Sequence, residues 1–293
     1  MSTADAPCRI CGEAAVPAGT MASSFSSRTY DLRQCPACRF AFVANPWTDY
    51  PRIYTDQYYA GRGADPHVDY VHETAHWDTT VRRYEWRGIL AAVSALTDIG
   101  GGTRWLDYGC GNGGLVRYAA EAGRAQVFGY DTGAMAESAR RSGLQILDDR
   151  QLGDAKGTFD LITAIEVIEH VPEPLDLLAA MRRLLKPGGL LFLTTGNLRP
   201  HRDRLLSWSY VLPDVHVSFF EPSTLARALE QTGFRAEQRR GVPGYSDIIR
   251  FKVLKSLGIR ESHLVERMLP WRLLSAVVDA RVGVSEHPVG WAR

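Results

Sequence analysis

The stretch WLDYGCGNGGLVRYAAEAG, residues 105–123, decides the fold of this 293-residue chain. Five of its nineteen positions are glycine, and four of these lie between an apolar run and a segment with helical spacing. Glycine lets the backbone turn sharply after a strand and approach a ligand closely, and the helix that follows presents its first amides to that ligand. The stretch therefore predicts a strand, a ligand-binding loop and a helix, in that order.

Strands and helices alternate on both sides of this loop. Such alternation is typical of a mostly parallel sheet with helices on both faces, so we expect an α/β fold with a doubly wound sheet. The expected strands are 103–108, 125–131, 144–148, 159–166, 190–195 and 234–241; the expected helices begin near 113 and 133, end at LKPGG (185–189) and span 223–232.

Changes in composition divide the chain into four parts. Residues 1–45 carry paired cysteines, and residues 46–100 hold an aromatic connector followed by helical spacing. Residues 101–243 form the alternating core. The alternation breaks in residues 244–293, where helical segments precede a last apolar run. There we expect a helical insertion that acts as a substrate lid, followed by a final strand.

Net charge and apolar patterning narrow the function classes. Thirty-four Lys and Arg against thirty-three Asp and Glu give a net charge of +1, which does not favour a nucleic-acid substrate. No stretch approaches the roughly 18 uncharged apolar residues of a membrane span, and the first residues lack an apolar leader core. We therefore expect a soluble, cytoplasmic protein without nucleic-acid or membrane partners, and the sequence does not indicate its oligomeric state.

Two ligand classes fit the glycine loop. Gly109, Gly111 and Gly114 satisfy GxGxxG, and Asp131 follows seventeen residues later, as in a dinucleotide site. Asp107, however, lies two residues before the first glycine, where its carboxylate favours an ammonium-bearing ligand and disfavours a pyrophosphate. An amino-acid nucleoside therefore fits better than NAD.

Four motifs in order make the chain resemble the class I S-adenosylmethionine-dependent methyltransferases from about residue 80 to 242: DYGCGNG, GYD, FDLITAIEVIEHV and LKPGGLLFLTT. The resemblance implies a seven-stranded Rossmann-like sheet, with Asp107 holding the methionine ammonium and Asp131 the two ribose hydroxyls. A helix N-cap is the structural alternative for Asp131. The residues that the resemblance places around the cofactor are Asp107, Gly109, Cys110, Gly111, Asp131, Thr132, Asp148, Ile165 and Glu166.

The EVIEH segment follows the strand end that lies beside the transferable methyl group in this family. Glu166, Glu169 and His170 share one face if the segment turns helically, and a general base for an acceptor hydroxyl fits there. The same spacing resembles the divalent-metal site of small-RNA 2′-O-methyltransferases and quinone-biosynthesis O-methyltransferases, with His216 as a further group. Structural capping is the third interpretation. We expect the base, with His170, Glu166 and His216 as the catalytic group, because a helix starting at Pro172 would turn Glu169 outward.

Two CxxC pairs, Cys8-Cys11 and Cys35-Cys38, are separated by twenty-three residues. Four thiolates in two such knuckles predict a closed, structural zinc site, with unligated buried thiols as the alternative. The N-terminal module is too short and polar to fold without a stabilising cross-link such as a zinc site. We therefore expect zinc to contribute to folding and not to catalysis.

The cysteine module, the connector and the core together resemble bacterial methyltransferases of sugar, glycan and natural-product pathways. We expect methyl transfer from S-adenosylmethionine to a small acceptor, a hydroxyl of a sugar or secondary metabolite. C-methylation of a sugar is disfavoured, because the extra C-terminal domain of those enzymes is absent. The alternatives are an RNA methyltransferase with a zinc knuckle and, outside enzymes, a cofactor-binding scaffold that docks a partner through zinc. For the connector's Tyr58 and Tyr59, core packing and closure over the cofactor both remain open.

Overall fold

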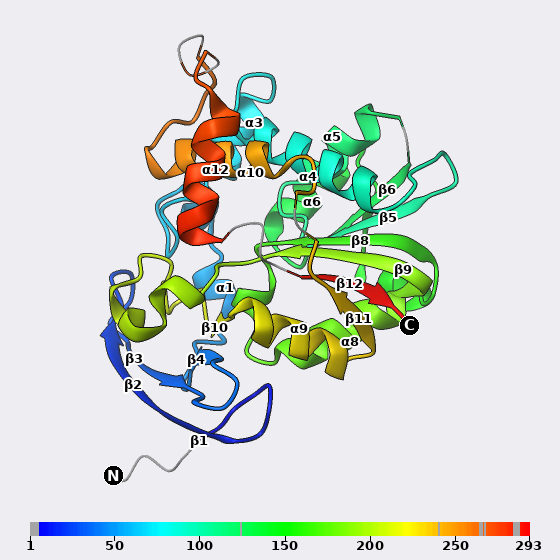
Figure 1. Ribbon diagram of the computed structural model, residues 1–293. Coiled ribbons are helices and arrows are strands. Elements are labelled where there is room, and N and C mark those ends of the chain that lie inside the picture. The colour runs from blue at the N-terminus through cyan, green and yellow to red at the C-terminus, as the bar shows by residue number, and fades with distance from the viewer. Residues whose placement is uncertain (1–5, 124, 240, 264–265, 267, 284–287) are drawn as a thin grey trace.

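The computed structural model describes residues 6–123, 125–239, 241–263, 266, 268–283 and 288–293, which form two sheets with helices around the larger one (Figure 1). The described part of the larger sheet has seven strands, in the order β11-β12-β9-β8-β5-β6-β7. β12 runs antiparallel to β11 and β9, and the pairs from β9 to β7 are parallel. The expected seven-stranded, doubly wound sheet is confirmed. Its strands are β5 (Arg104–Tyr108), β6 (Gln126–Tyr130), β7 (Ile146–Leu147), β8 (Phe159–Ile165), β9 (Leu185–Thr194), β11 (Phe234–Glu237) and β12 (Val289–Ala292).

Two hydrophobic cores cover the two faces of this sheet. Trp105 and Leu106 are consecutive on β5, yet they belong to different cores because successive strand residues point to opposite faces. The core around Leu106 includes α8 (Pro174–Leu184) and α9 (Pro222–Gln231). The core around Trp105 includes α4 (Arg82–Leu96), α5 (Gly114–Glu121) and α6 (Ala134–Arg141).

Some boundaries differ from the expectation. β9 begins at Leu185, five residues early, because Leu185 already pairs with Phe159. β11 ends at Glu237 and is four residues shorter than expected. A helix that the pattern did not predict, α7 (Asp149–Asp154), follows β7 and starts with a capping box between Asp148 and Gln151.

The N-terminal module is an antiparallel sheet that the core completes. Its strands are β1 (Ala6–Pro7), β2 (Ala14–Ala22), β3 (Thr29–Gln34) and β4 (Ala41–Val43), and β10 (Ser218–Phe219) from the core pairs with β4. Phe40 and Phe220 pack across this junction with ring centroids 5.0 Å apart. The module is therefore joined to the core through backbone pairing as well as apolar contact.

The connector and the C-terminal insertion lie close together at one end of the larger sheet (Figure 1). The connector has three short helices, α1 (Tyr50–Ile53), α2 (Asp56–Tyr59) and α3 (Tyr70–Ala75). The insertion contains α10 (Tyr245–Ser256) and α12 (Trp271–Val282), and α10 packs on α4. The start of the second expected helical segment, at residues 264, 265 and 267, lies outside the described residues. Among those that are described, no helix has the length and apolarity needed to span a membrane.

The seat of α10 on α4 depends on glycine. A Cβ at Gly88 would lie 2.6 Å from the carbonyl oxygen of Gly244 and 2.8 Å from Ile248, so Gly88→Ala should lower the stability by about 1–3 kcal/mol through overpacking. Gly153→Ala is the matched control, because nothing lies within 4 Å of its Cβ position. Thermal and urea unfolding of both variants measure the difference. Equal unfolding midpoints for Gly88→Ala and Gly153→Ala would show that α4 and α10 accommodate the added methyl group without a loss of stability.

Candidate functional site

The glycine loop runs from the end of β5 to the start of α5 in a backbone conformation that suits glycine. Gly109, Gly111 and Gly113 have φ values of 78°, 53° and 74°. The amides of Gly109 and Cys110 donate to the carbonyl of Tyr130, at 2.7 and 3.0 Å, which folds the loop over the end of β6. The predicted strand, loop and helix are present.

Asp107 is buried at the end of β5, directly before this loop. Its Oδ1 accepts a hydrogen bond from the hydroxyl of Thr163, at 2.8 Å, and that hydroxyl also accepts from the indole of Trp105. Burial raises the pKa of Asp107 to about 7. The carboxyl group therefore titrates near neutral pH, and an ammonium group placed beside it would favour the charged form.

Asp131 joins the end of β6 to the glycine loop. Its two oxygens accept from the amides of Gly111, at 3.0 Å, and Gly133, at 2.7 Å. The N-cap of α6 is Gly133, so Asp131 is not the helix cap that the sequence offered as its alternative. A carboxylate held at both oxygens by backbone amides is well oriented for a bidentate partner.

The other residues predicted around the cofactor occupy different positions. Cys110 is buried in the loop, Ile165 ends β8, and Thr132 is exposed after β6. Asp148 is exposed and accepts from the amide of Gln151 as the cap of α7, so it already has a structural role. Its contact with adenine stays a prediction.

Tyrosines of the connector cover the glycine loop. A Cβ at Gly133 would collide with the hydroxyl of Tyr59, and one at Gly111 would meet the ring of Tyr70 at 2.8 Å. Tyr59 and Tyr70 stack with their centroids 6.1 Å apart, while Tyr58 packs in the connector core. Sequence reasoning singled out Tyr59 but missed Tyr70, which has no motif to mark it.

Glu166 begins the acidic cluster at the end of β8. Its backbone has a left-handed φ of 54°, which is rare for a residue with a side chain. The carboxylate accepts from Thr194 at 2.9 Å, from Tyr210 at 3.0 Å and from the ammonium of Lys252 at 2.9 Å. Burial alone would raise the pKa of Glu166, but Lys252 and these hydrogen bonds hold it below its ordinary value. Glu166 is therefore a charged carboxylate.

Glu169 is completely buried beside Glu166, and the expectation that it points outward is wrong. The segment turns as a short 3₁₀ helix, η1 (Ile168–His170), and α8 starts at Pro174, so Glu169 does not lie in the first turn of α8. In addition, Val217 donates its amide to the Glu169 carbonyl at 2.7 Å. These constraints turn the side chain into the protein.

The hydroxyl of Tyr210 bridges the two carboxylates. It contacts Glu166 Oε2 and Glu169 Oε1, but it has one proton to donate. Burial, and next the charge of Glu166, raise the pKa of Glu169 to about 8. At neutral pH Glu169 is therefore mostly protonated. Its own proton can serve the contact between Glu169 and Tyr210, while the Tyr210 hydroxyl donates its proton to Glu166. Among the described side chains, Glu169 Oε2 is buried without a hydrogen-bond partner.

Two neutral histidines complete the cluster. His216 Nδ1 lies 2.7 Å from the carbonyl of Tyr210, so it carries the proton and leaves Nε2 with a free lone pair. His170 Nδ1 contacts the hydroxyl of Tyr54 at 3.2 Å. Burial, with the neighbouring His216, lowers the pKa of His170 to about 3, and burial also lowers that of His216. Ligand atoms of Glu169, His170 and His216 lie within 4.8 Å of one another.

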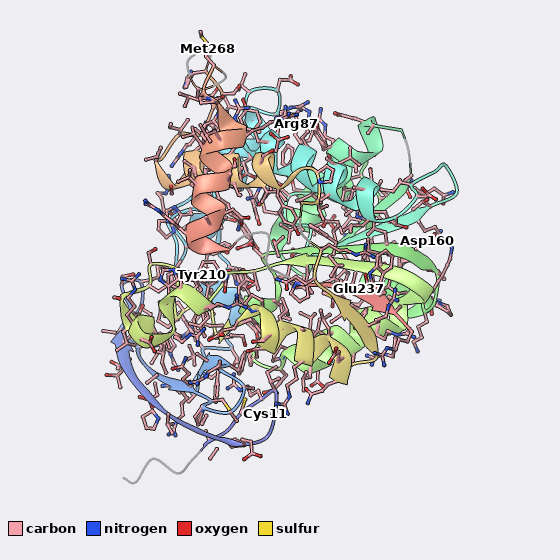
Figure 2. All side chains as sticks on the ribbon, in the orientation of Figure 1. Cys11, Arg87, Asp160, Tyr210, Glu237 and Met268 are labelled. Atoms are coloured by element: carbon pink, nitrogen blue, oxygen red, sulfur yellow. The ribbon has the colours of Figure 1, made fainter. Side chains whose placement is uncertain are left out.

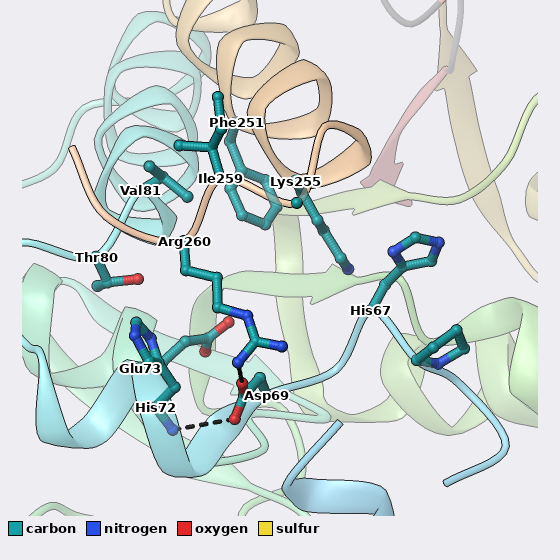
Figure 3. Close-up of a pocket in the computed structure, with 12 residues that line it drawn as sticks. His67, Asp69, His72, Glu73, Thr80, Val81, Phe251, Lys255, Ile259 and Arg260 are labelled. Carbon is teal, nitrogen blue, oxygen red and sulfur yellow. Dashed lines mark hydrogen bonds and ion pairs between the residues drawn. The ribbon is translucent and has the colours of Figure 1, made fainter. Parts of the chain in front are cut away.

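A pocket opens between α10 and the connector (Figure 3). Lys252 and Lys255 are three residues apart on α10, so one contacts Glu166 while the other lines the pocket one turn away. Burial and the nearby Arg82 lower the pKa of Lys255. The residues lining the pocket are Pro66, His67, Asp69, His72, Glu73, Thr80, Val81, Phe251, Lys255, Gly258, Ile259 and Arg260.

The four cysteines of the N-terminal module converge, and Figure 2 labels Cys11 among them in the lower part of the view. The sulfur atoms of Cys8 and Cys38 are 3.4 Å apart, and those of Cys11 and Cys35 are 3.5 Å apart. Sulfur atoms around a tetrahedral zinc ion are about 3.8 Å apart, given zinc–sulfur bonds of about 2.3 Å. The predicted four-cysteine cluster is present, and its sulfur atoms lie slightly closer together than they would around a bound zinc ion.

Comparisons with known proteins agree with this geometry. A methyltransferase domain model matches residues 79–239. The chain is 33% identical over 186 residues to the ubiquinone biosynthesis O-methyltransferase of Methylococcus capsulatus, covering 57% of this chain and 77% of that one. It is 31% identical over 212 residues to the enzyme of the same name from Aromatoleum aromaticum, covering 61% and 86%.

A solved structure supports the fold. It is the complex between the Haloferax volcanii Trm112 methyltransferase activator and a putative methyltransferase; the match has a TM-score of 0.51 and 17% identity, and covers 76% of this chain and 94% of that one. The chain belongs to the methyltransferase domain family. It is a class I S-adenosylmethionine-dependent methyltransferase, which confirms the resemblance and excludes the dinucleotide interpretation.

The pKa of Asp107 predicts how cofactor binding depends on pH. The ammonium of the cofactor favours the carboxylate form, so the affinity should rise as the pH increases through about 7 and then level off. Titration calorimetry with S-adenosylmethionine across this range measures the effect. Asp107→Asn should bind more weakly and lose the dependence, and a flat profile for the unmodified protein would contradict the assignment.

Asp131 should contribute to cofactor affinity through the ribose. Asp131→Ala should weaken binding of S-adenosylmethionine by about 1–3 kcal/mol, the value of charge-assisted hydrogen bonds. Asp154→Ala is the control, because Asp154 is exposed at the end of α7. Unfolding midpoints of both variants show whether loss of the Gly111 and Gly133 contacts disturbs the loop. Unchanged affinity in a folded Asp131→Ala protein would remove the residue from the site.

Proposed function

We propose that this protein transfers the methyl group of S-adenosylmethionine to a hydroxyl of a small acceptor, of the sugar, glycan or secondary-metabolite kind. The acceptor oxygen attacks the methyl carbon, the carbon–sulfur bond breaks, and the demethylated cofactor leaves. The hydroxyl proton passes to the protein. The observation that carries the proposal is the convergence of Glu169, His170 and His216 at the end of β8. The names of the two O-methyltransferase relatives support transfer to oxygen.

We propose further that the acceptor hydroxyl meets a cation site formed by Glu169, His170 and His216. One carboxyl group and two neutral imidazoles are a donor set that divalent cations accept, and the buried Glu169 Oε2 lacks a partner among the described residues. A bound divalent cation would supply a positive charge that lowers the pKa of the acceptor hydroxyl. His170 with a pKa of about 3 is a weak base at neutral pH, so this proposal replaces the expectation of a lone histidine base.

Glu166 and His216 keep catalytic-site roles in this proposal. Glu166 holds Tyr210 and Lys252, and through Tyr210 it orients Glu169. The carbonyl of Tyr210 orients His216. Tyr210 therefore positions both Glu169 and His216, and methyl transfer would benefit because alignment of the reacting atoms supplies much of the rate increase.

The insertion fits a substrate lid. α10 contributes Lys252 to the cluster, and Phe251 and Lys255 to the pocket. The pocket offers apolar side chains, Val81, Phe251 and Ile259, beside the half-buried ammonium of Lys255. An acceptor with an apolar body and an acidic or hydroxyl-rich end fits this lining.

The four-cysteine cluster fits a structural zinc ion. A site closed by four thiolates leaves no position for substrate, so zinc would contribute to folding. The N-terminal module that zinc would stabilise is connected to the cluster of Glu169, His170 and His216 through backbone hydrogen bonds. The amide of Val43 in β4 donates to the carbonyl of Val217 at 3.0 Å, and Val217 donates to Glu169. The N-terminal module thus holds the segment that carries His216.

The cation proposal predicts the outcome of chelation. With an acceptor identified by screening hydroxyl compounds with labelled cofactor, EDTA should stop turnover of zinc-replete protein, and Mn²⁺ or Co²⁺ should restore it. Glu169→Gln should lower the rate about 100-fold with cofactor affinity retained. Glu230→Gln, exposed on α9, is the control. Turnover that survives EDTA but falls in His170→Ala would contradict the cation site and support His170 as the general base.

The zinc proposal predicts metal content and protease resistance. Purified protein should hold about one tightly bound zinc on the cysteine cluster. Cys35→Ser should lose this zinc and expose residues 1–45 to limited proteolysis, because the module cannot close without its fourth ligand. Cys110→Ser should keep the zinc, since Cys110 lies in the glycine loop. Unchanged zinc and protease resistance in Cys35→Ser would mean that the thiols are unligated.

A further inference from the structure

A second cluster of metal-ligating side chains, formed by His72, His76 and Glu261, shares no residue with the Glu169, His170 and His216 cluster and lies at the pocket that His72 helps to line. His72 and His76 are four residues apart at α3, and their rings stack with centroids 4.1 Å apart. Glu261, from the segment after α10, reaches both rings. Its Oε1 is 3.6 Å from His72 Nε2 and 3.9 Å from His76 Nε2. These ligand atoms lie within 4.8 Å of one another.

Hydrogen bonds from neighbouring groups fix the orientation of His76 and Glu261, as they commonly do for metal ligands in proteins. His76 Nδ1 lies 3.1 Å from the carbonyl of His72, so this nitrogen carries the proton and Nε2 keeps its lone pair toward Glu261. Glu261 Oε2 accepts from the hydroxyl of Thr79 at 2.6 Å, which leaves Oε1 for the histidines. A second contact around each ligand is a regular feature of protein metal sites.

The backbone holds the two chain segments together at this point. Thr80 and Glu261 form an antiparallel bridge. The amide of Val81 donates to the carbonyl of Arg260 at 2.9 Å, and the amide of Ser262 donates to the carbonyl of Thr79 at 2.8 Å. Glu261 is therefore held opposite α3 by paired backbone on both sides.

We propose that His72, His76 and Glu261 bind a first-row transition-metal cation, with Zn²⁺, Co²⁺ and Ni²⁺ as the suitable ions. Two imidazoles and one carboxylate suit these cations better than Mg²⁺ or Ca²⁺. With bonds of about 2.0–2.1 Å, ligand atoms around a tetrahedral ion are about 3.3 Å apart, so the present 3.6 and 3.9 Å need only small side-chain adjustments. The exposed fraction of His76, 44%, and of Glu261, 36%, gives a cation access from solvent.

The sequence HETAH at residues 72–76 has the spacing of zinc peptidases, but the structure gives Glu73 another role. In those enzymes the glutamate is the general base for a metal-bound water. Here its carboxylate contacts Arg82 at 3.7 Å and the amide of Asn112 at 3.3 Å, within the protein. Arg82 holds Glu73 in that position. Glu73 is therefore held away from the role of a general base for a metal-bound water.

The proposed cation would clamp the connector to the insertion. α3 carries Tyr70, which covers Gly111, and Glu73, which contacts Asn112 of the glycine loop (Figure 3 shows Glu73 beside His72 and Arg260). The insertion side carries Arg260, which pairs with Asp69 at the start of α3. A cation joining these segments would hold the cover on the cofactor loop, so it should slow release of the cofactor product.

The test uses full-length protein with zinc on its cysteines. Co²⁺ is added, and binding is followed by calorimetry and by visible absorption, where a His and carboxylate site gives weak bands without thiolate charge transfer. We expect His72→Gln, His76→Gln and Glu261→Gln each to weaken this Co²⁺ equivalent tenfold or more. His201→Gln and Glu230→Gln are the matched controls and should bind as the unmodified protein does.

A variant of the methyl-transfer cluster separates the two sites. Glu169→Gln should still bind the Co²⁺ ion that His76→Gln fails to bind. The site at His72, His76 and Glu261 can therefore be confirmed even if the Glu169 cluster binds no cation. Absence of any Co²⁺ equivalent sensitive to His72, His76 and Glu261 would overturn the site. The clamp is tested by the dissociation rate of S-adenosylhomocysteine. We expect Co²⁺ to slow it in the unmodified protein and not in folded His76→Gln, and equal slowing in both would overturn the clamp.

Discussion

The burial of two carboxyl groups side by side is the constraint on which the active end of this protein depends. Glu166 and Glu169 follow β8 and are turned inward, where two unpaired negative charges would destabilise the fold by several kcal/mol. The structure resolves the conflict by giving Glu166 the ammonium of Lys252 and by keeping Glu169 mostly protonated, with Tyr210 between them. Any change in that balance, by an acceptor or a cation, acts on all four groups.

The partners of these carboxyl groups come from separate parts of the chain. Lys252 lies on the insertion, Tyr210 on the segment before β10, and the module that holds Val217 lies at the N-terminus. The core supplies Thr194 and Tyr210, but the one ammonium group that contacts Glu166, that of Lys252, comes from the insertion. The added parts therefore complete the electrostatics of the site, and this gives a physical reason for a small module and an insertion around a core that already binds the cofactor.

The predictable part of the molecule is the part that depends on local pattern. Strand and helix alternation and the spacing of Gly109, Gly111 and Asp131 indicate the sheet and the loop, because neighbours in sequence produce them. Tyr70, Tyr210 and Lys252 could not be found this way, since each reaches the site through long-range packing. Glu169 was misplaced for a related reason. The expectation started a helix at Pro172, whereas the backbone bond from Val217, 48 positions beyond Glu169, orients the segment.

The position of α10 is linked to the charge of the site through Lys252. Lys252 reaches Glu166 only while α10 is seated on α4 through the close approach of Gly88 and Gly244. If the helix moves away, Glu166 loses its cation, and the repulsion between Glu166 and Glu169 rises. A cationic group near the carboxyl pair, whether Lys252 or a bound cation, therefore lowers the free energy of the closed arrangement. If the insertion closes over an acceptor as proposed, the same movement would bring Lys252 to Glu166, so the charge balance that permits burial would also favour a site shielded from water during methyl transfer.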